Sequence, residues 1–313
     1  MKKLVIGLLT VAVLLTGYMV LGSIYKYELY DMAMTAEKSR ADLVEKEVDI
    51  NGIKVSYLEG PKPEGKPTML LIHGFAANKE NWIRFAGNLN EDYHIVAVDL
   101  LGHGKSTKNP ALRHDLDDQV QYLINFLNAK QLTKVHLVGN SMGGAISSLF
   151  AATHPERTLS VSLVNPAGVF DHRSVLQDYL DRGENPLVVK KVEDIYTLLD
   201  FAMEEKPFVP WPIPVVVAER SMANQALNEQ IFEHLKTDQH SYNFKDELTK
   251  IQAPALIMWG EQDRVINYKN SEIFDQLIPT SRTLIYPHIG HVPMIEIPEQ
   301  SASDIDAFIK GNA

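Results

Sequence analysis

The sequence predicts an α/β fold with a mostly parallel central sheet, helices on both faces and an inserted helical cap. The first observation is a series of short, continuous apolar runs separated by stretches of helical length: Thr68–Phe75, His94–Leu100, Lys134–Ser141, Leu159–Gly168 and Pro254–Asp263. Strands of a parallel sheet are covered by helices on both faces and are therefore apolar throughout. The second observation is that this rhythm stops between residues 169 and 244, where the chain is mostly helical and amphipathic.

The composition bounds the size and class of the protein. The chain has 313 residues, enough for one large α/β domain with an inserted subdomain or for two ordinary domains. Its net charge is −10 and it has no basic run beyond Lys2-Lys3, which argues against nucleic acid as a partner. The absence of cysteine excludes disulfides, thiol catalysis and cysteine-ligated zinc, and no motif indicates a metal or cofactor.

The N-terminus predicts a membrane anchor over residues 1–25. Lys2-Lys3 precede the uncharged run Leu4–Tyr25, which as a helix would be about 33 Å long and would span a bilayer. The two lysines favour a cytoplasmic N-terminus, so a single-pass protein would carry its catalytic domain on the extracytoplasmic side. The alternatives are a signal peptide cleaved after Val20–Gly22, which would release a secreted protein, and a buried core helix.

The rest of the chain divides by its local patterns. Residues 26–47 are expected to form a helical connector, and Val48–Leu58 alternates apolar and polar residues as an edge strand does. Apolar side chains at helical spacing predict an amphipathic helix between two of the buried strands: Leu116, Val120, Leu123, Ile124 and Leu127. We expect the core over residues 48–168 and 245–313, and the cap over residues 169–244.

A G-x-S-x-G pattern lies where a predicted strand ends and a helix begins. In this context Gly139, Ser141 and Gly143 predict a nucleophile elbow, a sharp turn that strains the serine backbone and raises its Oγ above the sheet. Side chains two residues before and after the serine would collide, which explains the glycines. The alternative is an ordinary strand–helix turn in which the serine only caps the helix.

An oxyanion hole requires two backbone donors near the nucleophile. One is expected to be the N–H of Met142, directly after the serine and at a helix N-terminus. The other should come from the loop after an earlier strand, where Phe75 is the candidate and Ala76 is next. His73 begins this loop and is interpreted as a structural histidine, because the order of a triad requires the base to follow the serine.

The acid and the base should follow the serine in that order. Asp263 lies at the end of an apolar strand, and Glu261 is its near rival. His291 is favoured as the base over His288, because it follows a glycine and precedes a helix-starting run. Asp99 precedes the serine and is interpreted as a residue that fixes a loop.

At these residues the chain resembles the α/β-hydrolase superfamily over roughly Val48–Lys310. Within it, GNSMGG, SLVNPAGVF and GHVPMIEIPE are similar to the corresponding stretches of bacterial lipases and of membrane-anchored monoacylglycerol lipases. The resemblance implies a carboxylic-ester hydrolase that works through a Ser-His-Asp triad and an acyl-enzyme. It implies monoacylglycerol, or another lipid or small ester, as the substrate.

Two other functions remain open at this point. Carbon–carbon bond hydrolases of aromatic ring-cleavage products share GNSMGG, but they usually carry an aromatic residue after the catalytic histidine, where this chain has Val292. A catalytically inactive, membrane-tethered binding module is the alternative from another class.

The predicted cap contains the segment PFVPWPIP, with four prolines in eight residues. This segment cannot be a regular helix and is expected to be a stiff apolar loop. Such a loop near a catalytic serine suits an acyl tunnel or contact with a membrane. Phe208 and Trp211 are therefore expected to bind substrate, together with Val292 beside the base.

Overall fold

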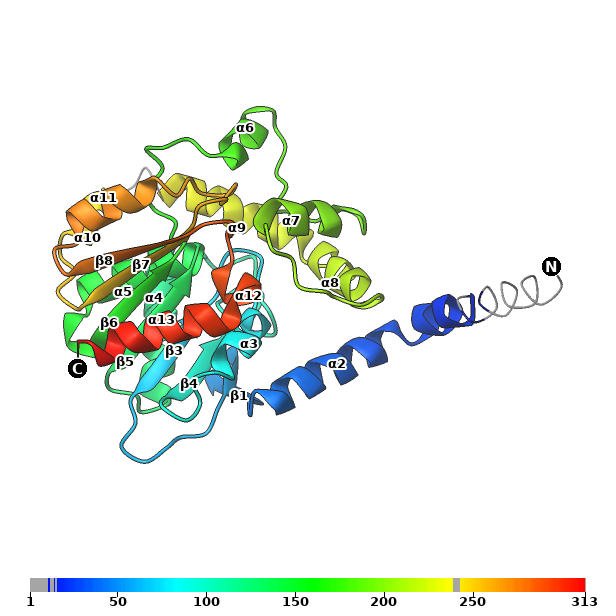
Figure 1. Ribbon diagram of the computed structural model, residues 1–313, viewed down its shortest axis with the longest axis horizontal. Helices are drawn as coiled ribbons and strands as arrows, with labels where there is room; N and C mark the ends of the chain where they lie inside the picture. The colour runs from blue at the N-terminus through cyan, green and yellow to red at the C-terminus, as the bar shows by residue number, and fades with distance from the viewer. Residues whose placement is uncertain (1–10, 12–13, 15, 239–242, 313) are drawn as a thin grey trace.

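The computed structural model describes residues 11, 14, 16–238 and 243–312, and its centre is an eight-stranded sheet (Figure 1). The strand order is β1-β2-β4-β3-β5-β6-β7-β8. The strands are β1 (Val44–Ile50), β2 (Ile53–Glu59), β3 (Thr68–Ile72), β4 (His94–Val98), β5 (Val135–Asn140), β6 (Thr158–Val164), β7 (Ala255–Gly260) and β8 (Ser281–Tyr286). The first two strands are antiparallel to their neighbours and β4-β3-β5-β6-β7-β8 are parallel, which confirms the predicted fold class.

The two edges of the sheet differ from the expectation. The alternating run Val48–Leu58 is not one strand, because β1 turns at Asn51-Gly52 into β2 with Ile50 opposite Ile53. Both turn residues have positive φ, 55° and 84°, as a two-residue hairpin of the Asn-Gly type requires. The opposite edge strand, β8, was not expected, since four of its six residues are exposed and it lacks a continuous apolar run.

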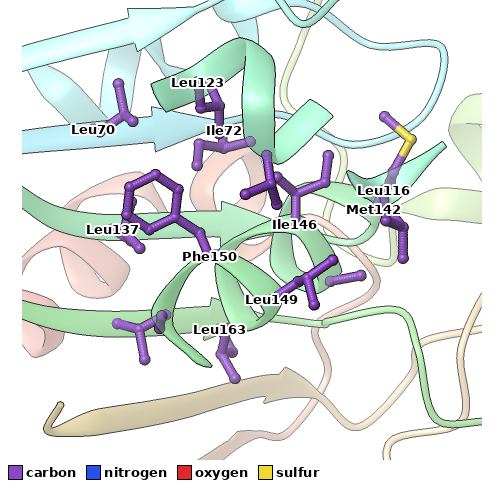
Figure 2. Packing of buried hydrophobic residues seen from close by; sticks show 14 of the residues in the cluster. Leu70, Ile72, Leu116, Leu123, Leu137, Met142, Ile146, Leu149, Phe150 and Leu163 are labelled. Atoms are coloured by element: carbon purple, nitrogen blue, oxygen red, sulfur yellow. The ribbon is translucent and has the colours of Figure 1, made fainter. Parts of the chain in front are cut away.

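Helices cover both faces of the sheet with two separate apolar cores. On one face, α4 (Leu116–Ala129), α5 (Met142–Thr153), α10 (Phe244–Leu248) and α11 (Asn270–Leu277) pack on the strands. Figure 2 shows this core, where Leu70 and Ile72 of β3 and Leu137 of β5 meet Ile146 and Phe150 of α5. The other face is covered by η1 (Lys79–Trp82), α3 (Ile83–Ala86), α12 (Pro293–Glu296) and α13 (Pro298–Lys310).

Helices also occupy the region in which the cap was predicted. Between β6 and β7 the described residues form α6 (Val175–Asp181), α7 (Asp194–Ala202), α8 (Ile213–Met222) and α9 (Gln225–Asp238), followed by α10. Helix α9 contacts the core through Phe232, whose ring lies 5.4 Å from that of Phe75. The boundaries 169–244 stay a prediction.

An N-terminal helix, α2 (Lys26–Arg40), projects from the core beside α8 (Figure 1). Lys26 and Tyr27 bind the Glu219 carboxylate at 2.5 and 2.7 Å, and the Arg220 guanidinium lies 4.2 Å from the centre of the Tyr30 ring. The connector region therefore packs against the helices after β6.

The predicted membrane anchor lies partly outside the described residues. Positions 4–10, 12, 13 and 15 of the run Leu4–Tyr25 are among those not described. In the part of the chain that the structure does describe, no helix is both long and apolar enough to cross a bilayer.

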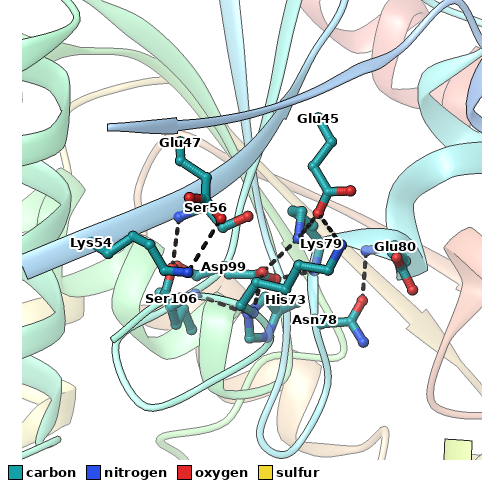
Figure 3. Close-up of polar contacts among 12 residues, drawn as sticks. Glu45, Glu47, Lys54, Ser56, His73, Asn78, Lys79, Glu80, Asp99 and Ser106 are labelled. Carbon is teal, nitrogen blue, oxygen red and sulfur yellow. Dashed lines mark hydrogen bonds and ion pairs between the residues drawn. The ribbon is translucent and has the colours of Figure 1, made fainter. Parts of the chain in front are cut away.

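A buried ion pair joins the loops after β3 and β4 (Figure 3). The Asp99 carboxylate, fully buried, accepts from the Lys79 ammonium at 2.6 Å and from the backbone N–H groups of Lys79 and Lys105 at 2.8 Å each. Glu45 adds a second ion pair to the Lys79 ammonium at 3.1 Å. Desolvation opposes the charge of Lys79, but the attraction of the two carboxylates outweighs it and raises the pKa of Lys79.

The loop between β3 and η1 is thus held at both ends. At its start, the His73 ring accepts at Nε2 from the backbone N–H of Leu100 at 3.0 Å. At its end, Lys79 is bound to Asp99. Asp99 was interpreted from the sequence as a residue that fixes a loop, and its carboxylate does bind Lys79 and the backbone N–H of Lys105.

We expect Asp99→Asn to lower the free energy of unfolding by about 3 kcal/mol, because it removes the main counter-charge of a buried ammonium. Glu47→Gln is the matched control, since Glu47 forms an exposed ion pair with Lys54 in the same region and should contribute at most about 1 kcal/mol. Urea unfolding of the two variants measures the difference. Equal losses would contradict a structural role for the buried pair.

Candidate active site

The turn between β5 and α5 places Ser141 at the carboxyl edge of the sheet. Its backbone has φ 56° and ψ −120°, a strained conformation for a residue with a side chain. A Cβ on Gly139 would lie 2.1 Å from the carbonyl oxygen of Gly143, and one on Gly143 would lie 2.3 Å from that of Ile72. The Ser141 side chain makes no capping hydrogen bond, so the alternative of a helix-capping serine does not hold.

The loop after β3 lies directly against this turn. A Cβ on Gly74 would stand 3.0 Å from the Cβ of Ser141, so the next residue, Phe75, is close to the nucleophile. Within the described residues, the backbone N–H groups of Phe75 and Met142 donate to no acceptor. Two free N–H groups beside a serine hydroxyl are the arrangement that an oxyanion hole requires.

His291 and Asp263 form a buried pair beside the turn. The Nδ1 of His291 lies 2.8 Å from Oδ2 of Asp263. The same carboxylate accepts four more hydrogen bonds, from Asn165 Nδ2, Trp259 Nε1 and the backbone N–H groups of Val265 and Ile266. The carboxylate therefore has a fixed orientation toward the imidazole.

The rival residues lie elsewhere. Glu261 and His288 are exposed, whereas Asp263 and His291 are buried. Sequence reasoning assigned no role to Asn165 or Trp259, which hold Asp263 in place. Asn165 carried one usable signal: it ends a buried strand, at the sheet edge where the other site residues gather.

Other buried histidines are poor candidates for the base. His73 donates from Nδ1 to the Gly74 carbonyl at 2.7 Å, and burial lowers its pKa to about 4. His136 pairs with Ser160 at 2.8 Å between β5 and β6, and burial lowers its pKa to about 4. Neither Ser160 nor His136 lines the cavity that contains Ser141.

Ser141 and His291 line one cavity of about 600 Å³. Phe75 lines it too, as does Val292, one of the three predicted substrate-binding residues. Apolar side chains from the helices after β6 and from the loops after β7 and β8 complete much of its wall: Leu187, Leu198, Leu199, Met203, Val265 and Ile295.

The structure does not bring the other two predicted substrate-binding residues into this cavity. Phe208 is 86% exposed and lines no part of it. The Trp211 ring packs edge-on against Tyr18, with 5.3 Å between the ring centres, and leaves no room for a side chain at Gly22. Trp211 therefore faces residues ahead of α2, which sequence patterns could not show because Tyr18 and Trp211 are 193 residues apart.

Comparisons with known proteins agree with this geometry. A model of the α/β-hydrolase fold family matches residues 67–298. Lipase 3 of Moraxella sp. (strain TA144) is 36% identical over 280 residues, 88% of this chain and 87% of the lipase. Monoacylglycerol lipase ABHD6 of Rattus norvegicus is 28% identical over 79% of this chain and 77% of its own length.

Among solved structures, a membrane phospholipase A described as a bacterial virulence factor superposes with a TM-score of 0.89. It is 41% identical, and the match covers 99% of both chains. The predicted fold and its resemblance are thereby confirmed: this chain belongs to the α/β-hydrolase family.

Proposed function

We propose that this protein is a carboxylic-ester hydrolase of the lipase/esterase type, with Ser141 as nucleophile, His291 as base and Asp263 as the acid that orients it. One observation carries the proposal. The strained Ser141, His291 and Phe75 line the same cavity, Asp263 holds the His291 ring from behind, and the second free N–H, of Met142, directly follows Ser141. Each of these features has a defined role in acyl transfer.

The geometry supports the usual two-step reaction. His291 takes the Ser141 hydroxyl proton as the oxygen attacks the ester carbonyl, and the N–H groups of Phe75 and Met142 bind the resulting oxyanion. The imidazolium then gives its proton to the leaving alcohol, and an acyl-enzyme remains. Water, activated by the same histidine, releases the acid and restores Ser141. Asp263 holds the imidazole tautomer throughout.

The cavity wall favours an ester with an apolar acyl chain. Each methylene buried there contributes roughly 0.8 kcal/mol of binding. The relatives are named lipases, monoacylglycerol lipases and a phospholipase, which supports a lipid ester such as a monoacylglycerol. A carbon–carbon bond hydrolase and an inactive binding module are the other candidates, and a preference for esters over ring-cleavage products distinguishes the proposed function from both.

We also propose a membrane location, with the uncharged run Leu4–Tyr25 as a single-pass anchor and an extracytoplasmic catalytic domain. The similarity to a structure described as a membrane phospholipase A supports this arrangement. A secreted protein after signal cleavage remains the alternative.

Substitution of the three proposed catalytic residues tests the mechanism. Ser141→Ala should abolish ester hydrolysis, and His291→Ala and Asp263→Asn should each lower turnover by at least about 1000-fold, since no other group supplies their roles. Turnover of a p-nitrophenyl ester measures the losses, and circular dichroism checks folding. A folded Ser141→Ala variant with near wild-type turnover contradicts the mechanism. If Asp99→Asn is folded but inactive while Asp263→Asn works, the acid is assigned to the wrong residue.

Chain-length preference tests the acyl-binding wall. Leu199→Ala should lower kcat/KM for decanoate esters by about tenfold and change acetate esters little, because Leu199 belongs to the apolar wall that we propose binds the acyl chain. Trp211→Ala is the control, because it removes an even larger apolar side chain that lies outside the cavity. Parallel losses on both esters in the Leu199 variant, or a strict acetate preference of the wild type, would contradict a lipase-type pocket.

Membrane extraction tests the anchor. The full-length protein should stay with membranes in alkaline carbonate, and protease added on the extracytoplasmic side should digest its catalytic domain. Recovery of a soluble mature chain that starts near Ser23 would support the cleaved signal peptide instead and would leave the enzyme assignment unchanged.

A further inference from the structure

The sheet order separates the cavity into two sides around the nucleophile. Ser141 follows β5, which lies at the centre of the order β4-β3-β5-β6-β7-β8. The lining residues after β7 and β8 are His291 and three apolar residues, Val265, Val292 and Ile295. Those after β3 and β4 include Lys79, Glu80, Lys105 and Lys108. An ester bound at Ser141 therefore has an apolar side and a charged side available to it.

Almost every charged residue on the second side already has a partner. Lys79 pairs with Asp99 and Glu45, and Lys105 pairs with Glu45 at 2.7 Å. Glu80, a carboxylate in the wall, accepts from the Tyr30 hydroxyl at 2.6 Å. Arg220 of α8, which lines the cavity from the opposite wall, pairs with Asp31 at 3.2 Å.

Lys108 differs from these residues. It lines the cavity, and across the described chain its side chain makes neither a hydrogen bond nor an ion pair. Desolvation lowers the pKa of Lys108, Asp99 opposes this effect, and the positive charge of Arg220 lowers it further. The positive charges of Lys108, in the loop after β4, and Arg220, on α8, therefore repel each other, and no carboxylate among the described residues binds Lys108.

A neutral donor lies on the same cavity. Asn228 of α9 is only 5% exposed and lines the cavity, yet its side-chain amide has no hydrogen-bond partner among the described residues. An amide on a cavity wall that no protein group binds can hydrogen-bond a ligand. An ammonium, a guanidinium and an amide that line one cavity match the oxygens of a phosphate group.

We propose that Lys108, Arg220 and Asn228 form a headgroup subsite for a phosphate-bearing lipid. The inference rests on the proposed function, since it assumes that the acyl chain lies on the apolar side and the ester at Ser141. The phosphate then lies on the side of β3 and β4, where Lys108 supplies the counter-charge. The subsite makes a phosphorylated glycerol ester a better ligand than the neutral glycerol ester of the same acyl chain.

Two ether lipids test the subsite without any reaction: dodecylglycerol ether, and the same ether phosphorylated on its terminal hydroxyl. Neither has an ester bond, so their Kd values do not depend on catalysis. Calorimetry on the full-length protein, below micelle-forming concentrations, should show at least about tenfold tighter binding of the phosphorylated ether. Lys108→Met should remove most of this preference, and Lys108→Arg should retain it.

Lys54→Met is the matched control, because Lys54 lies beside the same loop and is exposed like Lys108, but it pairs with Glu47 and does not line the cavity. It should keep the wild-type preference. Equal Kd values for the two ethers in the wild type, or a preference unchanged in Lys108→Met, overturn the subsite. Inorganic phosphate that competes as strongly as the lipid would show a site for free phosphate and would contradict a lipid headgroup. Loss of ester hydrolysis with an intact preference would overturn the proposed function alone.

Discussion

The active-site geometry depends on one steric constraint, the turn that carries Ser141. A strand buried on both faces must reverse into a helix within a few residues, and the backbone accomplishes this with a positive φ at a serine and with glycines where side chains have no space. The same turn brings Ser141 against the loop after β3 and leaves the N–H of Met142 unpaired. The strain is maintained because the buried sheet and α5 fix both ends of the turn.

Much of this could be predicted because the signals are local. Continuous apolar runs predicted the central parallel strands, and the G-x-S-x-G pattern between strand and helix predicted the turn. The edges could not be predicted in the same way. β8 carries mostly exposed residues, and the hairpin at Asn51-Gly52 was hidden inside a run that alternates as a single strand would.

The sequence left the choice between Asp263 and Glu261 open, since the two lie two residues apart at the end of one strand. The difference is made by backbone N–H groups at Val265 and Ile266, which bind the Asp263 carboxylate after the chain has turned inward. The position of Trp211 was equally inaccessible, because it depends on packing against Tyr18, which is 193 residues away in the sequence. The cavity instead takes its apolar wall from α7 and from the loops after β7 and β8.

Covalent trapping with an alkyl fluorophosphonate tests the central claim most directly. Such a reagent requires a nucleophile activated by a base and places its phosphoryl oxygen in the oxyanion hole. Peptide mass spectrometry should find a single adduct on Ser141, and a crystal structure of the adduct should place the phosphoryl oxygen within hydrogen-bond distance of the N–H groups of Phe75 and Met142. An adduct on another serine, or an intact Ser141 in the folded protein, would contradict the assignment of this turn as the catalytic centre.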